Sequence, residues 1–560
     1  MSSVLPAALA QLEAMLAPDR WLGFGVRAGA TALCVAIVSA TLLLRVGAAA
    51  YARLKAERHF DIDAYVGEPS PPLKSRAKVV LMHSFNVGRH AASAEPHALA
   101  EVVSPHMPGL HVTLRAGTPA ASAAKPCAAT PVSSLVVGTI RMGFGHHRIA
   151  YATASWGVES SHRTYFHDLL SIESVEADLI KETDKLYSKG SRLASELGGT
   201  IERFWGSLTK SGDADALRVT YQMAEHLKPL LLGFDRDTPI IATHCLVGLL
   251  AIACGFRKVV NLVIDNHAQW FVVVPGALNL VQGPSNYHAL LRMGVPAKQL
   301  KLVGAWIPKP LVDNIGVDCA AREARARARA PLRVLLPVGG AGAQRSFICS
   351  LVAALVPEVA AGRVELLLNA GDHTHMRDAF VAALTGAGGA PAASSPHDGL
   401  ATSGARGGGA AGGGGVAYAT VSSMEGVLAF CDGLRAGRAP AAPVTLFAFD
   451  DYFPAVAATD QLCRVTDVLA CKPSELAFYP VPKLMIRRVG DHEAYSALRA
   501  SELGDGTLEA RELGDALAYV RLFGAEGGHL ALAMNEAIRK NNTIGVYSGC
   551  KHAVELATRL

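Results

Sequence analysis

Short apolar runs alternate with amphipathic helical patterns along most of this 560-residue chain. A strand buried on both faces appears as an unbroken apolar run, and helices between such runs are typical of parallel sheets covered on both sides. The expected strands are residues 79–82, 135–139, 240–243, 259–264, 334–337, 364–369, 444–449 and 468–471. An Arg/Ala-rich helical stretch, residues 321–330, divides them into two halves. The sequence therefore predicts an α/β protein with two doubly wound domains facing each other across a cleft.

The N-terminal region contains an apolar stretch, residues 28–50, that is about long enough to cross a bilayer. We expect residues 1–27 to precede a single transmembrane helix and residues 51–77 to link it to the body. The basic residues around it are Arg20 and Arg27 before the stretch, and Arg45, Arg53, Lys55 and Arg58 at or after its end. Because more basic residues follow the apolar stretch than precede it, the catalytic body that follows is expected on the cytosolic side of the membrane. The alternative is a signal peptide cleaved near Ala48, although the region before the apolar stretch is long for one.

The rest of the chain divides into three parts. We expect an N-terminal domain over residues 78–330, a C-terminal domain over residues 331–526, and C-terminal crossing helices over residues 527–560. Two Ala/Gly/Ser-rich stretches, residues 115–131 and 385–415, lack any apolar period. Both are predicted to be surface loops, and the second a disordered insertion in the C-terminal domain.

The composition excludes two classes of protein. The chain has 53 Lys+Arg against 48 Asp+Glu, a formal charge of +5, which is too balanced for a nucleic-acid-binding surface. Half of the residues are hydrophobic, which excludes wholesale disorder. The ten cysteines are scattered without CxxC pairs, so we expect free thiols in a reducing compartment.

The first candidate site follows the expected strand 135–139. Gly143 and Gly145 allow a tight turn close to a ligand, and His146 and His147 stand at the start of the next helix. A GxGH turn at the end of a strand indicates that His146 faces a ligand. The alternative is a structural turn whose histidines only cap the helix.

The second candidate site follows the expected strand 259–264. Asp265 and His267 lie two positions apart at the strand end, where an acid and a histidine can polarise each other for proton transfer. An Asp–His hydrogen bond that only stabilises the loop explains the same pair equally well.

In the second half of the chain, small residues follow the expected strand 334–337. This turn consists of Gly339, Gly340, Ala341, Gly342, Ala343 and Gln344. Successive backbone N–H groups beside a helix N-terminus suit a diphosphate. There is no Gly-Lys-Ser/Thr ending and no acidic ribose partner at the dinucleotide spacing, so phosphate binding without dinucleotide redox chemistry is favoured.

A polar loop also follows the expected strand 468–471. Lys472, Ser474 and Glu475 supply a cation, a hydroxyl and a carboxylate that could hold phosphate and ribose. Lys472 may equally be read as a solvated turn residue. We expect no metal and no cofactor, because the acidic motif at residues 235–237 precedes its strand and the histidines at residues 372–375 lack a third ligand.

Several of these motifs, in this order, resemble a known family. Gly143 to His146, the segment 263–271 that includes Trp270, and residues 281–285 with 294–296 look like the acceptor domain of monogalactosyldiacylglycerol synthases. The turn 339–344 is similar to the start of the donor domain there and in the lipid-linked N-acetylglucosaminyltransferases of peptidoglycan synthesis. The resemblance spans about residues 79–521 and implies a GT-B glycosyltransferase with two Rossmann-like domains, the nucleotide-sugar donor in the second and the acceptor in the first.

The resemblance also assigns residues on the donor side. Lys472 to Glu475 stands where the family has a small-residue loop that receives the donor. Arg487 and Glu493 lie near a loop and an acid that contact sugar or ribose in family members.

The function expected from residues and resemblance together is inverting, metal-independent transfer of a sugar from a UDP-type donor to a lipid, glycan or other membrane-associated acceptor. His146 is the expected base, Asp265 and His267 shape the acceptor side with His147 and Trp270, and the domains close about a hinge near Ala330. Two alternatives remain: a nucleotide-sugar epimerase or hydrolase on the same scaffold, and a membrane-tethered binding protein without turnover.

Overall fold

A computed structural model gives the fold of the chain in two compact units, residues 1–89 and 90–560, which are described separately. The residues that the structure describes are 18–67, 75–76, 79–80, 83–84, 93, 95–142, 144–185, 214–339, 344–386, 401–403, 415–488, 493–524 and 528–560.

The first unit is dominated by helix α2 (Pro18–Ala56), which is followed by the short helix α3 (Ile62–Val66). Within the described residues, one segment, Leu33–Ala56, is long and apolar enough to cross a membrane, with a mean hydropathy of 2.1 over a window that is not buried at all. The helix thus runs beyond the expected anchor, and residues 51–56 of the expected linker belong to it. The hydroxyl of Tyr51 donates a hydrogen bond of 2.8 Å to Asp63 and joins the end of α2 to α3.

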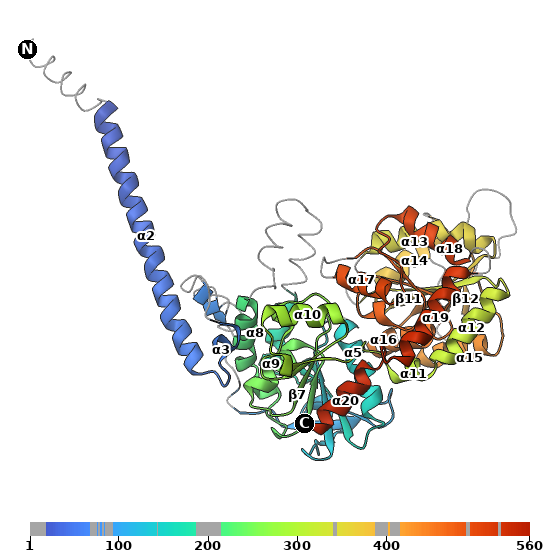
Figure 1. Ribbon diagram of the computed structural model, residues 1–560, viewed down its shortest axis with the longest axis horizontal. Coiled ribbons are helices and arrows are strands. Elements are labelled where there is room, and N and C mark those ends of the chain that lie inside the picture. Colours follow the sequence, from blue (N-terminus) through green and yellow to red (C-terminus); the bar gives the residue numbers. More distant parts are fainter. Residues whose placement is uncertain are drawn as a thin grey trace, which may run out of the picture. The chain divides into compact units, whose positions relative to one another are not determined.

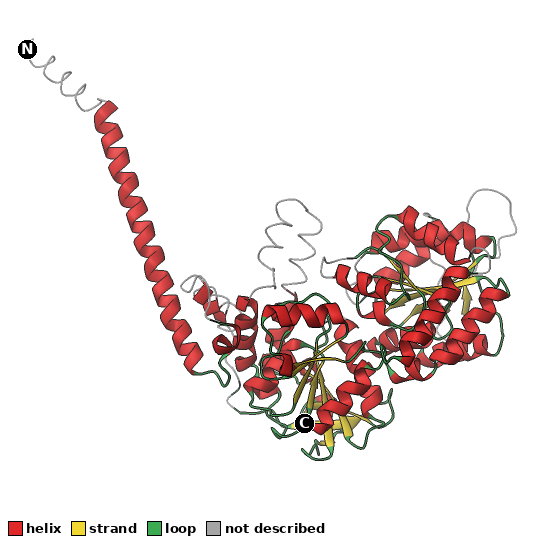
Figure 2. Cartoon of the chain, viewed as in Figure 1, coloured by secondary structure: helices red, strands yellow, loops and turns green. Residues whose placement is uncertain are grey.

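The second unit contains two lobes, each built on one sheet with helices on both faces (Figure 2). The described part of the first sheet has nine strands. In spatial order they are β3 (Lys125–Pro126), β1 (Leu99–Val103), β2 (Leu110–Arg115), β5 (Arg163–Asp168), β4 (Ser134–Thr139), β6 (Ile240–Ala242), β7 (Val259–Leu262), β8 (Leu278–Val281) and β9 (Leu300–Leu302). From β2 to β9 the neighbours are parallel, which places their carboxyl ends along one edge.

The first sheet corrects two sequence predictions. Residues 115–131 are not a plain loop, because they include the 3-10 helix η1 (Pro119–Ala121) and strand β3, which pairs antiparallel with β1. Val79 and Val80, expected to begin a strand, are helical, and residues 81–82 lie outside the described part. The β1–β2 pair is also antiparallel, so the sheet is mixed. Short, partly exposed edge strands lack the long apolar runs that revealed the central ones.

The helices of the first lobe cover the central strands, and Figure 1 shows α9, α10 and α20 around β7. They include α5 (Phe144–Gly157), α8 (Ala214–His226), α9 (Cys245–Ala253), α10 (Pro284–Met293) and the C-terminal α20 (Gly549–Arg559). In the core, Leu135 and Val260 of the sheet form one apolar cluster with Cys550 and Ala553 of α20. The last helix of the chain therefore packs on the first lobe.

The second sheet has seven strands among the described residues. In spatial order they are β12 (Ala401–Ser403), β13 (Tyr418–Val421), β14 (Val444–Ala448), β11 (Val364–Gly371), β10 (Leu332–Pro337), β15 (Val468–Cys471) and β16 (Lys483–Met485). All neighbours are parallel except β12 and β13. Strand β12 lies inside the stretch 385–415 that was expected to be disordered, so that expectation is wrong for these three residues; residues 387–400 and 404–414 lie outside the described part.

The helices of the second lobe include two that precede its first strand. They are α11 (Lys309–Asp313), α12 (Ile315–Arg327), α13 (Arg345–Ala360), α14 (Thr374–Thr385), α15 (Met424–Arg435), α16 (Tyr452–Cys463), α17 (Ala494–Glu502), α18 (Leu513–Gly524) and α19 (His529–Thr543). Ile315 and Cys319 of α12 lie in the same buried cluster as Phe447 and Leu469 of the second sheet. The first domain therefore ends earlier than the expected residue 330.

The chain crosses between the lobes where two backbone segments meet. The N–H of Ala305 donates to the carbonyl of Val546 at 2.6 Å, and the N–H of Gly549 donates to the carbonyl of Ala305 at 3.0 Å. Gly304 has φ +96°, and a Cβ there would lie 2.5 Å from the Val546 carbonyl oxygen. The chain enters the second lobe at this crossing, before α12, and the domain closure expected about a hinge near Ala330 stays a prediction.

All ten cysteines are free, which confirms the prediction of unpaired thiols.

Candidate active site

The candidate active site begins at the carboxyl edge of the first sheet. His146 is on the first turn of α5, directly after β4, and Thr243 and His244 follow β6. Asp265 follows β7 along the same edge. Ligands of parallel α/β sheets bind beyond the carboxyl ends of the strands, so these side chains stand where the fold places a site.

A hydrogen bond determines which nitrogen of His146 can act as a base. Its Nδ1 lies 2.7 Å from the carbonyl oxygen of Thr243. A carbonyl only accepts, so Nδ1 carries the hydrogen and Nε2 is the basic nitrogen of the neutral ring. Burial lowers the pKa of His146 and outweighs the Thr243 carbonyl and the carboxylates of Asp265 and Glu475, which raise it. His146 is therefore neutral at pH 7.

A second histidine lies against the first. The ring centroids of His244 and His146 are 4.4 Å apart. The Nδ1 of His244 accepts a hydrogen bond of 3.1 Å from the N–H of Leu246, which leaves the ring hydrogen on Nε2. Burial, followed by the proximity of His146, lowers the pKa of His244 well below its usual value. Sequence reasoning missed His244, although its place directly after a buried strand was a usable signal.

On the donor side, Lys472 of the second lobe lies beside Gly339, the first residue of the glycine turn. It follows β15 directly, and its side chain runs along Gly339, where a Cβ would lie 3.3 Å from the Lys472 Cε. Its Nζ donates to Glu493 at 2.5 Å. Burial alone would lower the pKa of Lys472, but the carboxylates of Glu493, Glu475 and Asp265 outweigh it and raise the pKa. Lys472 is thus a charged, paired cation and not the solvated turn residue of the alternative interpretation.

Glu475 belongs to the second lobe and lies against α5 of the first lobe. It begins the 3-10 helix η6 (Glu475–Phe478), and a Cβ at Gly145 of α5 would lie 3.3 Å from its Oε2. Burial would raise the pKa of Glu475, but Arg148 and then Lys472 outweigh it, and a hydrogen bond from Ser474 adds to their effect, so the pKa is lowered. Glu475 is therefore ionised beside the turn that carries His146.

An arginine missed by sequence reasoning holds this arrangement together. Arg148, also on α5, is 3% exposed, and its Nη1 donates to Asp460 of α16 at 3.2 Å and to the Val456 carbonyl at 3.0 Å. Its Nε lies 3.6 Å from Glu475. The hydroxyl of Tyr479 donates to the same oxygen of Asp460 at 2.8 Å. No sequence signal marked Arg148, because its partners lie more than 300 positions away.

The remaining first-lobe predictions are placed in different surroundings. His147 is buried, with its Nε2 3.2 Å from Asp168 and its ring edge-on to Phe166, so it faces the interior of the lobe. The ring of His267 lies 4.6 Å from that of Tyr495 on α17. Trp270 begins the 3-10 helix η4 (Trp270–Val272), and Gly143 lies outside the described residues.

The remaining second-lobe predictions surround the start of α13. Gln344 has a left-handed backbone, φ 67°, and its amide donates to the carbonyl of Arg487. This contact connects the glycine turn with the segment that carries Arg487, which is exposed. Residues 340–343 lie outside the described part of the chain.

Comparisons with family models divide the chain close to the lobe boundary. Residues 101–292 match the model described as domain of unknown function DUF6937, and residues 295–558 match domain of unknown function DUF6938. The comparison with curated proteins gives no match.

Solved structures share low similarity with the chain over about three quarters of its length. The S. aureus MnaA–UDP co-structure is 10% identical, with a TM-score of 0.39 over 75% of this chain and 95% of that one. UDP-GlcNAc 2-epimerase from Neisseria meningitidis bound to UDP-GlcNAc is 9% identical, with a TM-score of 0.38 over 76% of this chain and 100% of that one. The α,α-trehalose 6-phosphate synthase from Burkholderia multivorans is 12% identical, with a TM-score of 0.38 over 76% and 98%. Similarity at this level carries no information on the reaction.

Proposed function

We propose that the protein is an inverting, metal-independent glycosyltransferase that moves a sugar from a UDP-type donor to a lipid or other membrane-associated acceptor. One observation supports the proposal: Glu475 of the second lobe lies against the turn that carries His146, because a Cβ at Gly145 would lie 3.3 Å from Glu475 Oε2. Lys472 stands three residues before Glu475 and runs along Gly339, the first residue of the glycine turn. We infer that the expected base and this cation serve one site at the carboxyl edges of both sheets.

In the proposed reaction, Nε2 of His146 removes the proton of the acceptor hydroxyl. The acceptor oxygen forms its bond to the anomeric carbon as the bond from that carbon to the diphosphate oxygen breaks. The bonding electrons leave with UDP, and the proton stays on His146 as imidazolium. A single in-line displacement inverts the anomeric carbon. The Asp265 and Glu475 carboxylates stabilise the imidazolium.

Lys472 is paired with Glu493, and Arg148 with Asp460, so these two cations are already neutralised. The backbone N–H groups of residues 340–343, which lie outside the described part of the chain, are proposed to take the diphosphate, assisted by Arg487. On donor binding, Lys472 would turn towards the diphosphate, which leaves Glu493 or Glu475 to accept hydroxyls of the sugar or ribose.

The membrane part of the proposal rests on α2. The apolar residues along its exposed side include Leu33, Val35, Ile37, Val38 and Leu42. A bilayer would remove this surface from water, and the basic residues beyond it favour a cytosolic catalytic body. An acceptor in the same membrane would then be held near the site.

The proposal is tested with the full chain in detergent. A panel of nucleotide sugars is screened by thermal shift, and sugar transfer to extracted membrane lipids is measured with the donor that binds. We expect His146→Ala to lower kcat by about 10²- to 10⁴-fold without loss of donor binding. The matched control is His288→Ala, an exposed histidine of α10, which should retain full turnover.

Three outcomes would contradict the proposal. Full turnover of His146→Ala would remove His146 as the base. Release of free or epimerised sugar without an acceptor would favour the epimerase or hydrolase alternative. Lack of stabilisation by every nucleotide sugar would favour a binding protein.

A further inference from the structure

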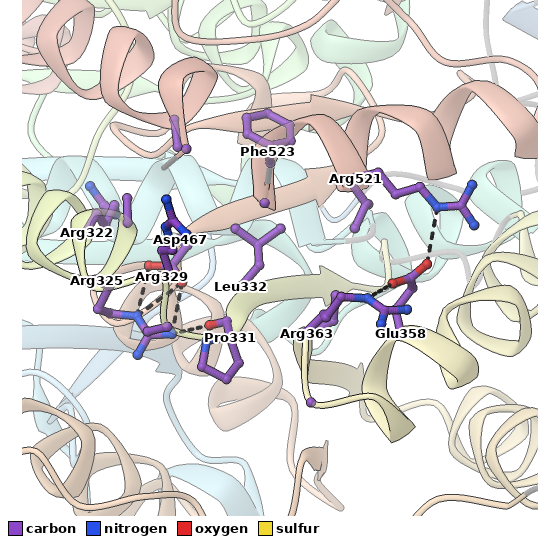
Figure 3. A pocket seen from close by; sticks show the side chains of 18 residues that line it. Arg322, Arg325, Arg329, Pro331, Leu332, Glu358, Arg363, Asp467, Arg521 and Phe523 are labelled. Atoms are coloured by element: carbon purple, nitrogen blue, oxygen red, sulfur yellow. Dashed lines mark hydrogen bonds and ion pairs between the residues drawn. The ribbon is translucent and has the colours of Figure 1, made fainter. Parts of the chain in front are cut away.

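A cavity lies at the opposite edge of the second sheet from the candidate active site. It has a volume of 680 Å³ and opens at Leu332 and Val364, the first residues of β10 and β11 (Figure 3). Lys472 stands at the other end of the neighbouring strand β15. Six residues of β10 span about 20 Å, so the two sites are separate. The volume is in the range of small-molecule sites.

Positive charge dominates the lining of this cavity. Five arginines and two carboxylates line it, namely Arg322, Arg325, Arg329, Arg363, Arg521, Glu358 and Asp467. Both carboxylates are already paired: Asp467 with Arg325 at 3.1 Å, and Glu358 with Arg363 at 2.6 Å and Arg521 at 3.2 Å. Figure 3 shows these two groups on either side of Leu332. The lining therefore has more arginines than carboxylates, and its net charge is positive.

Arg322 and Arg329 account for two of the three excess positive charges, and the third arises because the single carboxylate of Glu358 pairs with two arginines. The buried guanidinium of Arg322 donates to the carbonyls of Thr466 at 2.8 Å and Cys463 at 2.9 Å. Carbonyl oxygens satisfy its hydrogen bonds but do not cancel its unit charge. Among the residues that the structure describes, the exposed guanidinium of Arg329 has no ion pair or hydrogen bond, and its backbone is left-handed, with φ 51°.

The rest of the wall is apolar. Its apolar side chains are those of Ala326, Pro331, Leu332, Val364, Val520, Phe523 and Ala531. A basic rim over an apolar wall suits a ligand that combines an anionic group with an apolar body, because each part meets a matching surface.

We propose that this cavity binds a phosphorylated small molecule with an apolar or aromatic body, at a site separate from the candidate active site. The phosphate lies at the rim, where Arg329 provides the unpaired guanidinium and Arg325 and Arg521 add to the positive potential. The apolar body packs on Ala326 and Pro331, two partly exposed apolar residues of the wall. Guanidinium groups suit phosphate because they donate in a planar fork. The proposal is independent of any reaction at His146.

The test uses isothermal titration calorimetry on the full chain in detergent, with 1-naphthyl phosphate as the probe and inorganic phosphate and 1-naphthol as its two halves. We expect saturable binding of 1-naphthyl phosphate that weakens with salt and is at least tenfold tighter than binding of either half. Arg329→Ala should weaken it about tenfold. Arg327→Ala, an exposed arginine at the end of α12 that does not line the cavity, should leave it unchanged.

Each contrary result overturns the proposal. Absence of saturable binding, or equal affinities in Arg329→Ala and Arg327→Ala, would show that the cavity does not hold the phosphate. Binding of 1-naphthol as tight as that of 1-naphthyl phosphate would mean an apolar pocket without anion recognition, and equal binding of inorganic phosphate would exclude a role of the apolar wall. Displacement of the probe by UDP would place it in the candidate active site instead.

Discussion

His146 combines a defined tautomer with a lowered pKa. The Thr243 carbonyl holds the hydrogen on Nδ1, and burial keeps the ring neutral at pH 7 although two carboxylates are near. The base is therefore present above its lowered pKa and is lost only as the pH falls through it. The basic Nε2 and the lowered pKa favour the interpretation of His146 as a proton acceptor over that of a helix cap, because capping the helix does not require a free basic nitrogen.

The pH dependence of turnover follows at this scale. We expect kcat/KM to be constant between pH 7 and 8 and to fall about tenfold per pH unit below the pKa of His146, which lies under the usual 6.5. Glu475→Gln removes a carboxylate that raises this pKa, so the acid limb should move to lower pH. His288→Gln should not move it. A limb that moves to higher pH in Glu475→Gln would contradict the assignment, and the measurement is the pH–rate profile of the three proteins.

At the scale of the element, α5 presents three consecutive side chains to three environments. Successive residues of a helix point about 100° apart. His146 accordingly meets the carboxyl edge of the sheet, His147 packs against Phe166 inside the lobe, and Arg148 reaches Asp460 of the second lobe. A single turn of α5 thus carries the expected base His146, the core residue His147, and Arg148, which contacts the second lobe.

The Arg148 contact is testable by stability. Arg148→Met removes a buried guanidinium and leaves the half-buried carboxylate of Asp460 without its cation, and we expect a loss of up to about 3–5 kcal/mol in the free energy of unfolding. The double variant Arg148→Met with Asp460→Asn should recover part of the loss, because the unpaired charge is gone. The control Arg377→Met breaks an exposed pair with Asp378 and should cost less than about 1 kcal/mol. Equal losses for Arg148→Met and Arg377→Met in urea unfolding would contradict the structure.

At the scale of the molecule, the crossing between the lobes depends on the absence of a side chain. Gly304 has φ +96°, and a Cβ would meet the Val546 carbonyl oxygen at 2.5 Å, which is backbone and cannot move cheaply. Gly304→Ala should therefore lower the free energy of unfolding by at least about 2 kcal/mol. Gly316→Ala on α12, where a Cβ meets open space, should leave it unchanged or raise it by up to about 1 kcal/mol. Thermal unfolding measures the stability of both variants against the unchanged protein. A Gly304→Ala protein as stable as the unchanged one would argue against this crossing.

Seven of the eight expected strands overlap β4, β6, β7, β10, β11, β14 and β15, because each of these is a local apolar run. Nine of the described strands escaped prediction: β1, β2, β3, β5, β8, β9, β12, β13 and β16. Among them, β3, β9, β12 and β16 are edge strands of two or three residues, and β5, between β2 and β4, mixes charged and aromatic residues and has no apolar run. The helical stretch expected at residues 321–330 overlaps only the second half of α12 (Ile315–Arg327) and was assigned to the first domain, since helical periodicity does not show which sheet covers the apolar face of a helix.

The repeated strand–turn–helix units and the polar residues after their strands can be found in the sequence, because apolar runs and glycine turns are local properties. Which strand ends meet depends on the folded chain. The fold places His244 against His146, Glu493 on Lys472, and Glu475 beside Gly145. These contacts join residues between about 20 and 330 positions apart, and they depend on strand order and on the chain crossing between the lobes, which no local pattern encodes.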